Sequence, residues 1–207
     1  VAHLEDDMID DDSNAELDRR LKSGRPLPMV DLRIVDEQMN DVPRDGKSTG
    51  EVVVRAPWVT QGYFKNPEAS EALWRGGYLH TGDIGHIDDE GYLKVTDRVK
   101  DVIKSGGEWI SSILLEDIVS QFPGVAEAAA IGVPDERWGE RPVVLVVPSE
   151  EARGSLDCDA IREHVRTFAE RGEISRWAVP ERIELVDSID KTSVGKIDKK
   201  RLRQRYG

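Results

Sequence analysis

Two largely apolar runs, the first broken only by Glu127, constrain the fold of this chain more than any other feature. They span residues 125–133 and 142–147, which is the length of a strand buried on both faces and well below the ~18 apolar residues that cross a membrane. Three segments around them have helical patterns, at residues 114–122, 156–168 and 198–205. One further strand is predicted at residues 180–186. The order of these segments predicts an α+β domain with a short sheet flanked by helices, beginning near residue 102.

The first half of the chain shows strand and turn signals instead. Residues 83–87 and 91–95 have the pattern of β-strands and flank an Asp-Asp-Glu-Gly turn, which predicts a β-hairpin. Asn66 followed by Pro67 predicts the start of a helix, because asparagine caps helix N-termini and proline fits the first turn. We therefore expect a small antiparallel β-subdomain over residues 1–97. A separate domain is expected over residues 98–207, after a charged link.

The composition excludes several classes of protein. The formal net charge is -12, and charged residues make up 34% of the sequence. Such a surface repels nucleic acid and anionic membranes, so phosphate binding requires a local basic patch. The N-terminus lacks the features of a signal peptide, and we expect no transmembrane segment. The acidic cluster at residues 5–12 is interpreted as a solvated helix start, with no metal site expected.

The single cysteine, Cys158, excludes an internal disulfide and favours a reducing compartment, so we expect a cytoplasmic protein. Cys158 lies between two aspartates, whose charges raise the pKa of a thiol. We interpret it as an ordinary residue near a helix start and not as a nucleophile.

Three short segments contain candidate functional residues. Asp83 follows a glycine turn, where two exposed oxygens would suit paired ribose hydroxyls. The alternative is a turn aspartate that accepts from backbone donors. Arg98 and Lys100 alternate in a basic stretch that includes Lys104, and their spacing predicts one side of an extended segment. The alternative is a solvated strand leading into a turn.

Two glycine positions complete the set. Gly106-Gly107 removes side chains where a ligand or another backbone can pass closely. Gly195 frees the backbone before Lys196, so this lysine could be swung into a site. A lysine near an α-phosphate would offset charge that develops during nucleophilic attack. A Gly-Lys pair alone does not indicate a functional site. Here it follows the Asp83 segment and the Arg98–Lys100 segment, and this order and spacing favour a functional role for Lys196.

These motifs, in this order, resemble the adenylate-forming superfamily, which includes acyl-CoA synthetases, aryl-CoA synthetases, luciferases and peptide-synthetase adenylation domains. The resemblance covers nearly the whole chain and includes Gly50-Glu51 and Gly62-Tyr63. The segments that resemble the fatty-acyl-CoA branch in particular are residues 57–60, 105–112 with Glu116, 132–135 and 138–142.

The resemblance implies a two-step reaction in which a fatty acid and ATP give an acyl-adenylate and pyrophosphate, and CoA then gives acyl-CoA and AMP. Between the steps the C-terminal domain turns on a hinge. By motif, Lys196 is the catalytic lysine of adenylation, Asp83 and Arg98 bind the nucleotide, and Lys100 is the hinge. The thioester face is implied to contain Lys104, Gly106, Gly107 and Trp109.

Two family motifs are absent from the sequence: the Gly- and Ser/Thr-rich phosphate loop, and the Tyr-Gly-x-Thr-Glu segment whose glutamate helps to hold Mg²⁺. We expect both in a missing N-terminal large domain, so the isolated chain should be inactive in adenylation. Asp190 replaces the usual proline of the last motif, which should loosen the Lys196 loop and add negative charge. Two alternatives remain: an aryl- or coumarate-type CoA ligase, and a non-catalytic module that binds AMP or a partner.

Overall fold

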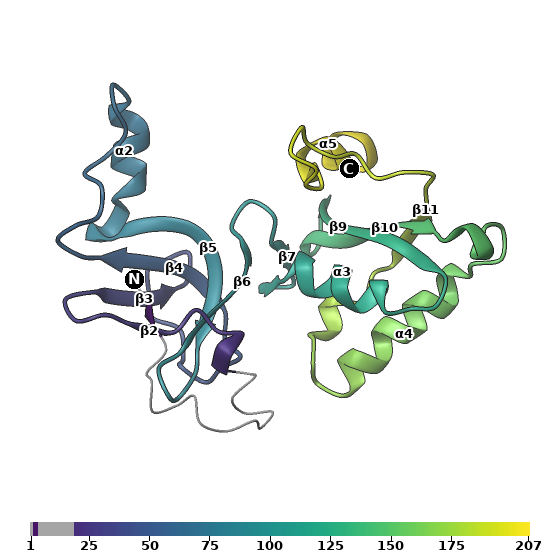
Figure 1. Ribbon diagram of the computed structural model, residues 1–207, viewed down its shortest axis with the longest axis horizontal. Helices are drawn as coiled ribbons and strands as arrows, with labels where there is room; N and C mark the ends of the chain where they lie inside the picture. The colour runs from purple at the N-terminus through teal and green to yellow at the C-terminus, as the bar shows by residue number, and fades with distance from the viewer. Residues whose placement is uncertain (1, 4–18) are drawn as a thin grey trace. The chain divides into compact units, whose positions relative to one another are not determined.

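The computed structural model describes residues 2–3 and 19–207, and the chain divides into two compact units, Val1–Lys100 and Asp101–Gly207 (Figure 1). The acidic N-terminal segment and the helix start expected there lie outside the described residues. Both units combine sheet and helix, so the expected α+β class is confirmed.

The first unit is built on a four-stranded antiparallel sheet in the order β3-β4-β5-β6. Leu32 and Ile34 on β3 alternate with polar residues and pack with Val52, Ile87 and Leu93 in one apolar cluster. This is the period-2 pattern of a sheet with one buried face. The strands are β3 (Asp31–Val35), β4 (Gly50–Arg55), β5 (Leu79–Ile87) and β6 (Leu93–Arg98), and the short strands β1 (Ala2–His3) and β2 (Arg25–Pro26) form a separate antiparallel pair.

Two local expectations in this unit are confirmed. Strands β5 and β6 form the antiparallel hairpin, and the Asp88 carboxylate accepts from the backbone N–H of Tyr92 at 2.8 Å in its turn. The helix α2 (Pro67–Leu73) begins where the sequence predicts, because the Asn66 side chain accepts from the backbone N–H of Ala69 at 3.1 Å. A short 3₁₀ turn, η2 (Arg75–Gly77), links α2 to β5.

The second unit has a five-stranded sheet with helices on both faces (Figure 1). Strand β10 pairs antiparallel with β9 and parallel with β11. The elements in chain order are β7 (Ile103–Ser105), β8 (Glu108–Ile110), α3 (Ser112–Ser120), β9 (Val125–Asp135), β10 (Gly139–Pro148), η3 (Glu150–Ala152), α4 (Cys158–Glu170), η4 (Arg176–Ala178), β11 (Arg182–Leu185) and α5 (Lys199–Tyr206).

Alternation along the two apolar runs explains why both faces are covered. On β10, Val144 and Val146 pack into a cluster with α3 and α4, whereas Val143 and Leu145 pack into a second cluster with Leu202 of α5. Successive side chains of a strand point to opposite faces. A continuous apolar run such as that of β10 therefore requires cover on both faces of the sheet. The sequence predicted this arrangement as a short sheet flanked by helices.

The segment after residue 102 contains two short strands, β7 and β8. It forms a short antiparallel hairpin in which Ile103 pairs with Ile110 and Lys104 pairs with Trp109. Gly106 and Gly107 have positive φ values of 62° and 83°, which glycine adopts without steric cost. The glycine pair therefore reverses the chain between the two strands.

Cys158 is the first residue of α4 and is partly buried. Burial, followed by the negative charge of Asp157, raises the pKa of the Cys158 thiol above its usual value. Because the thiolate is the reactive form, this environment supports the interpretation of Cys158 as an unreactive residue.

Candidate functional site

The first part of the candidate site is an ion pair at the end of the β5–β6 hairpin. Asp83 and Arg98 are register partners, and Arg98 Nε lies 2.8 Å from Asp83 Oδ1. Their side chains are 29% and 60% exposed, so solvent reaches both groups. The structure thus brings together the two residues that the sequence assigned to nucleotide binding.

The glycine turn expected before Asp83 is instead a bulge within β5, where the β4–β5 pairing shifts register, and it is fixed by hydrogen bonds that reach across the sheet. The Thr81 hydroxyl donates to the carbonyl of Val52 at 2.8 Å and accepts from the backbone N–H of Asp83 at 3.1 Å. Gly82 has a φ of 72°, and its carbonyl accepts from the backbone N–H of Val99 at 2.9 Å. The left-handed glycine and the Thr81 hydroxyl together hold the Asp83 carboxylate at a defined place.

The expectation that Arg98 and Lys100 share one side of an extended segment was wrong. Arg98 is the last residue of β6, and residues 99–101 form a turn. The backbone N–H of Val99 still donates to the Gly82 carbonyl of β5, and the chain turns away directly after it. Lys100 is exposed in this turn and is the last residue of the first unit.

The second part of the site is the β7–β8 hairpin. The Lys104 ammonium lies 5.0 Å from the centre of the Trp109 ring, which is within cation–π range. The backbone N–H of Lys104 donates to Glu140 Oε2 at 2.9 Å, which ties the hairpin to β10. The turn glycines differ: a Cβ on Gly106 would lie 2.8 Å from the Trp177 ring, whereas a Cβ on Gly107 would meet no atom within 4 Å.

Sequence reasoning assigned no role to the residues beneath this turn. The rings of Trp138 and Trp177 have centroids 4.5 Å apart, and the backbone N–H of Gly106 donates to the Trp138 carbonyl at 3.0 Å. Arg141 Nη1 donates to Ser105 Oγ and to the Trp177 carbonyl, both at 3.2 Å. Trp138 and Arg141 stand in a motif that the sequence analysis identified. Trp177 is not part of any motif, and only the fold brings it here.

We predict that Gly106→Ala lowers the free energy of unfolding by about 3 kcal/mol. A left-handed alanine costs about 1–2 kcal/mol, and the contact with Trp177 adds an overpacking cost of about 1–3 kcal/mol. Gly107→Ala is the matched control, because it carries only the backbone cost. Urea denaturation followed by tryptophan fluorescence measures both variants. Equal losses in the two variants would show that Trp177 does not constrain Gly106.

The third part is the loop between β11 and α5, which contains Lys196. The backbone N–H of Thr192 donates to the Lys196 carbonyl at 2.7 Å, and that of Gly195 donates to the Thr192 carbonyl at 2.9 Å. Lys191 and Ile197 form a β-bridge at the base of the loop. Lys196 itself is exposed. Its side chain is therefore presented to solvent from a loop with a closed backbone.

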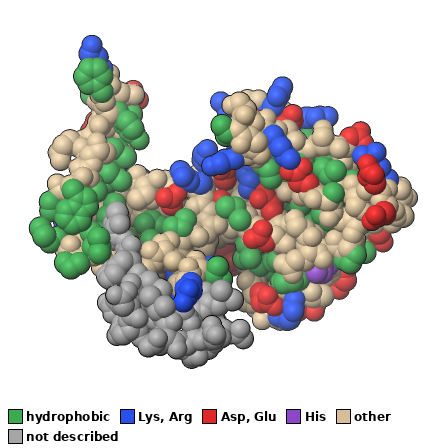
Figure 2. All heavy atoms as spheres, in the orientation of Figure 1, with side chains coloured by type: hydrophobic (Ala, Val, Ile, Leu, Met, Phe, Trp, Pro, Cys, Tyr) green, Lys and Arg blue, Asp and Glu red, His purple; other side chains and the backbone are tan. Residues whose placement is uncertain are grey.

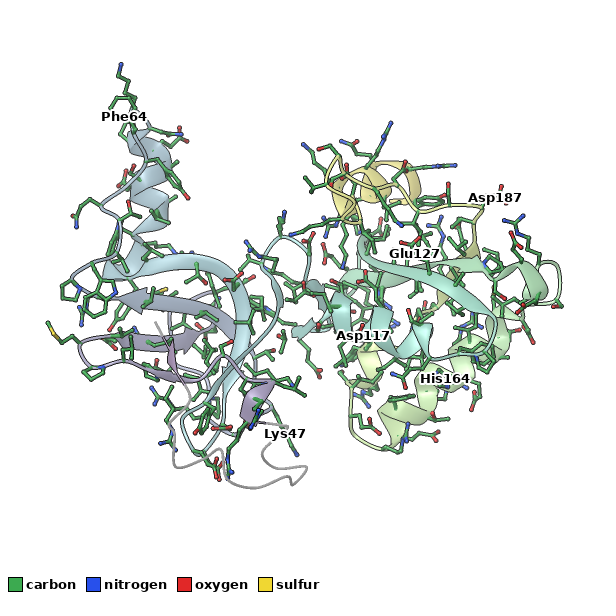
Figure 3. All side chains as sticks on the ribbon, in the orientation of Figure 1. Lys47, Phe64, Asp117, Glu127, His164 and Asp187 are labelled. Atoms are coloured by element: carbon green, nitrogen blue, oxygen red, sulfur yellow. The ribbon has the colours of Figure 1, made fainter. Side chains whose placement is uncertain are left out.

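The surroundings of this loop are basic, although the chain as a whole is acidic. Figure 2 shows Lys and Arg side chains gathered over α5, whose sequence is KKRLRQRY. Asp190 lies 3.9 Å from both Arg201 and Arg205, and its carbonyl accepts from the backbone N–H of Asp198 at 2.8 Å. Glu127 of β9, labelled in Figure 3, pairs with Lys191 at 2.9 Å. The negative charge that Asp190 adds is thus opposed by two arginines.

The described part of the chain comprises residues 2–3 and 19–207. No group of three or more His, Cys, Asp or Glu side chains there is arranged to hold a metal ion. No helix in the same part of the chain is long and apolar enough to cross a membrane.

Comparison with known proteins gives two family matches. Residues 7–64 match the AMP-binding enzyme family, and residues 114–196 match the AMP-binding enzyme C-terminal domain. Among curated relatives, a long-chain-fatty-acid–CoA ligase of Thermus thermophilus is 42% identical over 92% of this chain and 34% of its own length. A feruloyl-CoA synthase of an Amycolatopsis species is 38% identical over 89% of this chain and 36% of its own length.

Solved structures agree with these matches. The amide bond synthetase McbA of Marinactinospora thermotolerans has a TM-score of 0.73 at 35% identity and covers 95% of this chain, which in turn covers 38% of McbA. A Mycobacterium tuberculosis fatty acyl CoA synthetase has a TM-score of 0.57 at 34% identity, over 90% of this chain and 35% of its own. The chain spans about a third of the length of the curated relatives it matches. It belongs to the AMP-binding enzyme family, the adenylate-forming superfamily that its motifs resemble.

Proposed function

We propose that this chain is the C-terminal portion of an AMP-forming acyl-CoA synthetase, an acid–thiol ligase. In the first step, a carboxylate oxygen attacks the α-phosphorus of ATP and pyrophosphate leaves. In the second step, the CoA thiolate attacks the acyl carbon and AMP leaves. The observation that supports this proposal best is the ion pair of Asp83 and Arg98, which solvent reaches and which lies in segments that resemble the nucleotide-binding motifs of the superfamily.

The residues of the first unit would bind the nucleotide. A carboxylate that remains partly exposed can accept hydrogen bonds from the two ribose hydroxyls. The Arg98 guanidinium, 2.8 Å away, would orient this carboxylate and offer its remaining donors to the ribose and its phosphate. We assign no residue of this chain to Mg²⁺, which is expected to accompany ATP in the full-length enzyme.

The second unit would supply one lysine-bearing loop for each step. Lys196 would stabilise the charge that develops at the α-phosphate during adenylation. Lys104, Gly106, Gly107 and Trp109 would form the face used in thioester formation, where the open side of Gly107 leaves room for the pantetheine arm. We propose Val1–Lys100 as the last part of the large domain and Asp101–Gly207 as the mobile domain, with Lys100 as the hinge between them.

A fatty acid is the proposed carboxylate substrate, and the cytoplasm is the proposed compartment. The support for a fatty acid is the motif with Trp109, together with the similarity to a long-chain-fatty-acid–CoA ligase. Similarity to a feruloyl-CoA synthase favours an aryl acid as the second candidate. Acyl-CoA formation by the full-length enzyme, measured with palmitate, octanoate and ferulate, decides between them. Turnover of ferulate alone would overturn the fatty-acid assignment.

We predict that the 207-residue chain alone does not release pyrophosphate from ATP and a fatty acid. Its sequence lacks the phosphate loop and the glutamate for Mg²⁺, which supply positioning and charge stabilisation in such transfers. A coupled pyrophosphate assay compares the chain with a protein-free blank and with a full-length relative. Release above the blank would contradict the prediction. If the chain binds AMP but the full-length protein also shows no turnover, the non-catalytic binding module becomes the better description.

A further inference from the structure

A buried charged residue lies next to the Lys196 loop. Lys199 is the first residue of α5 and is 9% exposed. Its ammonium donates to Ser112 Oγ at 2.6 Å and pairs with Glu116 Oε1 at 2.7 Å. The same Glu116 oxygen accepts from the backbone N–H of Ala130 on β9 at 2.8 Å. These contacts, which we call the Lys199 bridge, connect α5, α3 and β9 inside the second unit.

The Lys199 bridge stands at the junction of two functional segments. The loop that contains Lys196 ends at Asp198, which caps α5 by accepting from the backbone N–H of Arg201 at 3.1 Å. On the other side, Ser112 is the first residue of α3, and only Ser111 separates it from β8. The bridge therefore links the Lys196 loop to the β7–β8 hairpin through short, regular elements.

The rest of the loop has little packing of its own. Val194 at its tip is 77% exposed, and residues 191–196 are all exposed. Ile189 and Leu202 are buried at its two ends, but apolar contacts are non-directional. The Lys199 bridge is directional, because an ammonium with two defined acceptors fixes the rotation of α5 as well as its position.

We propose that Lys199 is a positioning residue for Lys196. Through Glu116 and Ser112, it fixes the first turn of α5 and thereby the direction in which the loop presents the Lys196 ammonium. This inference rests on the proposed function of Lys196. Replacing both charges of a buried pair by apolar residues often leaves stability unchanged, so stability and positioning can be separated by experiment.

The first test measures the loop directly in the 207-residue chain. The double variant Lys199→Met/Glu116→Gln removes both charges and keeps an amide oxygen that accepts from the Ala130 N–H, and Lys200→Met is the matched control on the exposed side of α5. We expect urea stability close to that of the parent chain and amide exchange about tenfold faster at Thr192 and Gly195, whose N–H groups close the loop. If the double variant is destabilised, Lys199→Met alone provides the same readout, because it removes the ammonium and leaves the Glu116 contact with Ala130 in place. Unchanged exchange in a variant without the ion pair would overturn the proposal.

The second test asks whether the effect acts through Lys196 in the full-length enzyme. The double variant should lower the single-turnover adenylation rate about tenfold with an unchanged KM for ATP. Combined with Lys196→Ala, it should cause no further loss, because both changes remove the same interaction. A full additive loss would overturn the proposal. If Lys196→Ala alone has no effect, the proposed role of Lys196 fails, and the exchange measurement still decides whether the bridge orders the loop.

Discussion

Lys196→Ala in the full-length enzyme is expected to lower the rate of adenylation about 100-fold, which corresponds to roughly 3 kcal/mol of transition-state stabilisation. Lys196 is exposed on a loop whose backbone is closed by two hydrogen bonds. The closed backbone limits where the Lys196 ammonium can lie, and we expect this ammonium to stabilise the charge that develops at the α-phosphate. Single-turnover formation of acyl-adenylate measures the loss.

The control reaction for this variant is the second half-reaction, thioester formation. Ready-made acyl-adenylate and CoA should give thioester at a nearly unchanged rate. Lys191→Ala is the matched control in the same loop, because Lys191 pairs with Glu127 at the surface and such pairs contribute only about 0–1 kcal/mol. If thioester formation falls as far as adenylation, Lys196 does not have the role proposed for it.

Lys100→Pro in the full-length enzyme is expected to separate the two half-reactions. Lys100 is exposed in the turn after β6 and directly precedes the second unit. Proline fixes φ near about -65° and disfavours the helical region for the preceding Val99. Domain rotation is absorbed by a few backbone dihedrals at such a link. Adenylation should persist and thioester formation should fail, because we expect the fixed φ to permit the adenylating arrangement.

Lys100→Ala is the control for this variant, since it removes the side chain and keeps the backbone free. It should retain both half-reactions in single-turnover assays. A Lys100→Pro enzyme that folds and keeps both activities, or loses both equally, would place the hinge at another residue.

Local patterns in the sequence predicted several of the strands and helices and their order along the chain. The apolar runs predicted β9 and β10, the Asn66-Pro67 pair predicted the start of α2, and the Asp-Asp-Glu-Gly turn predicted the β5–β6 hairpin. These features depend on residues that are close in the chain, where periodicity and capping act locally. The order of the motifs also indicated the family.

Only the tertiary structure decided which distant residues meet. Lys199 and Ser112 are separated by 87 positions, and no local pattern announces their hydrogen bond. A Cβ on Gly106 would lie only 2.8 Å from the ring of Trp177, and Arg98 reaches Asp83 because the hairpin register places them opposite each other. Such contacts arise from the packing of whole elements, and a buried pair gains its strength from the solvent that this packing excludes.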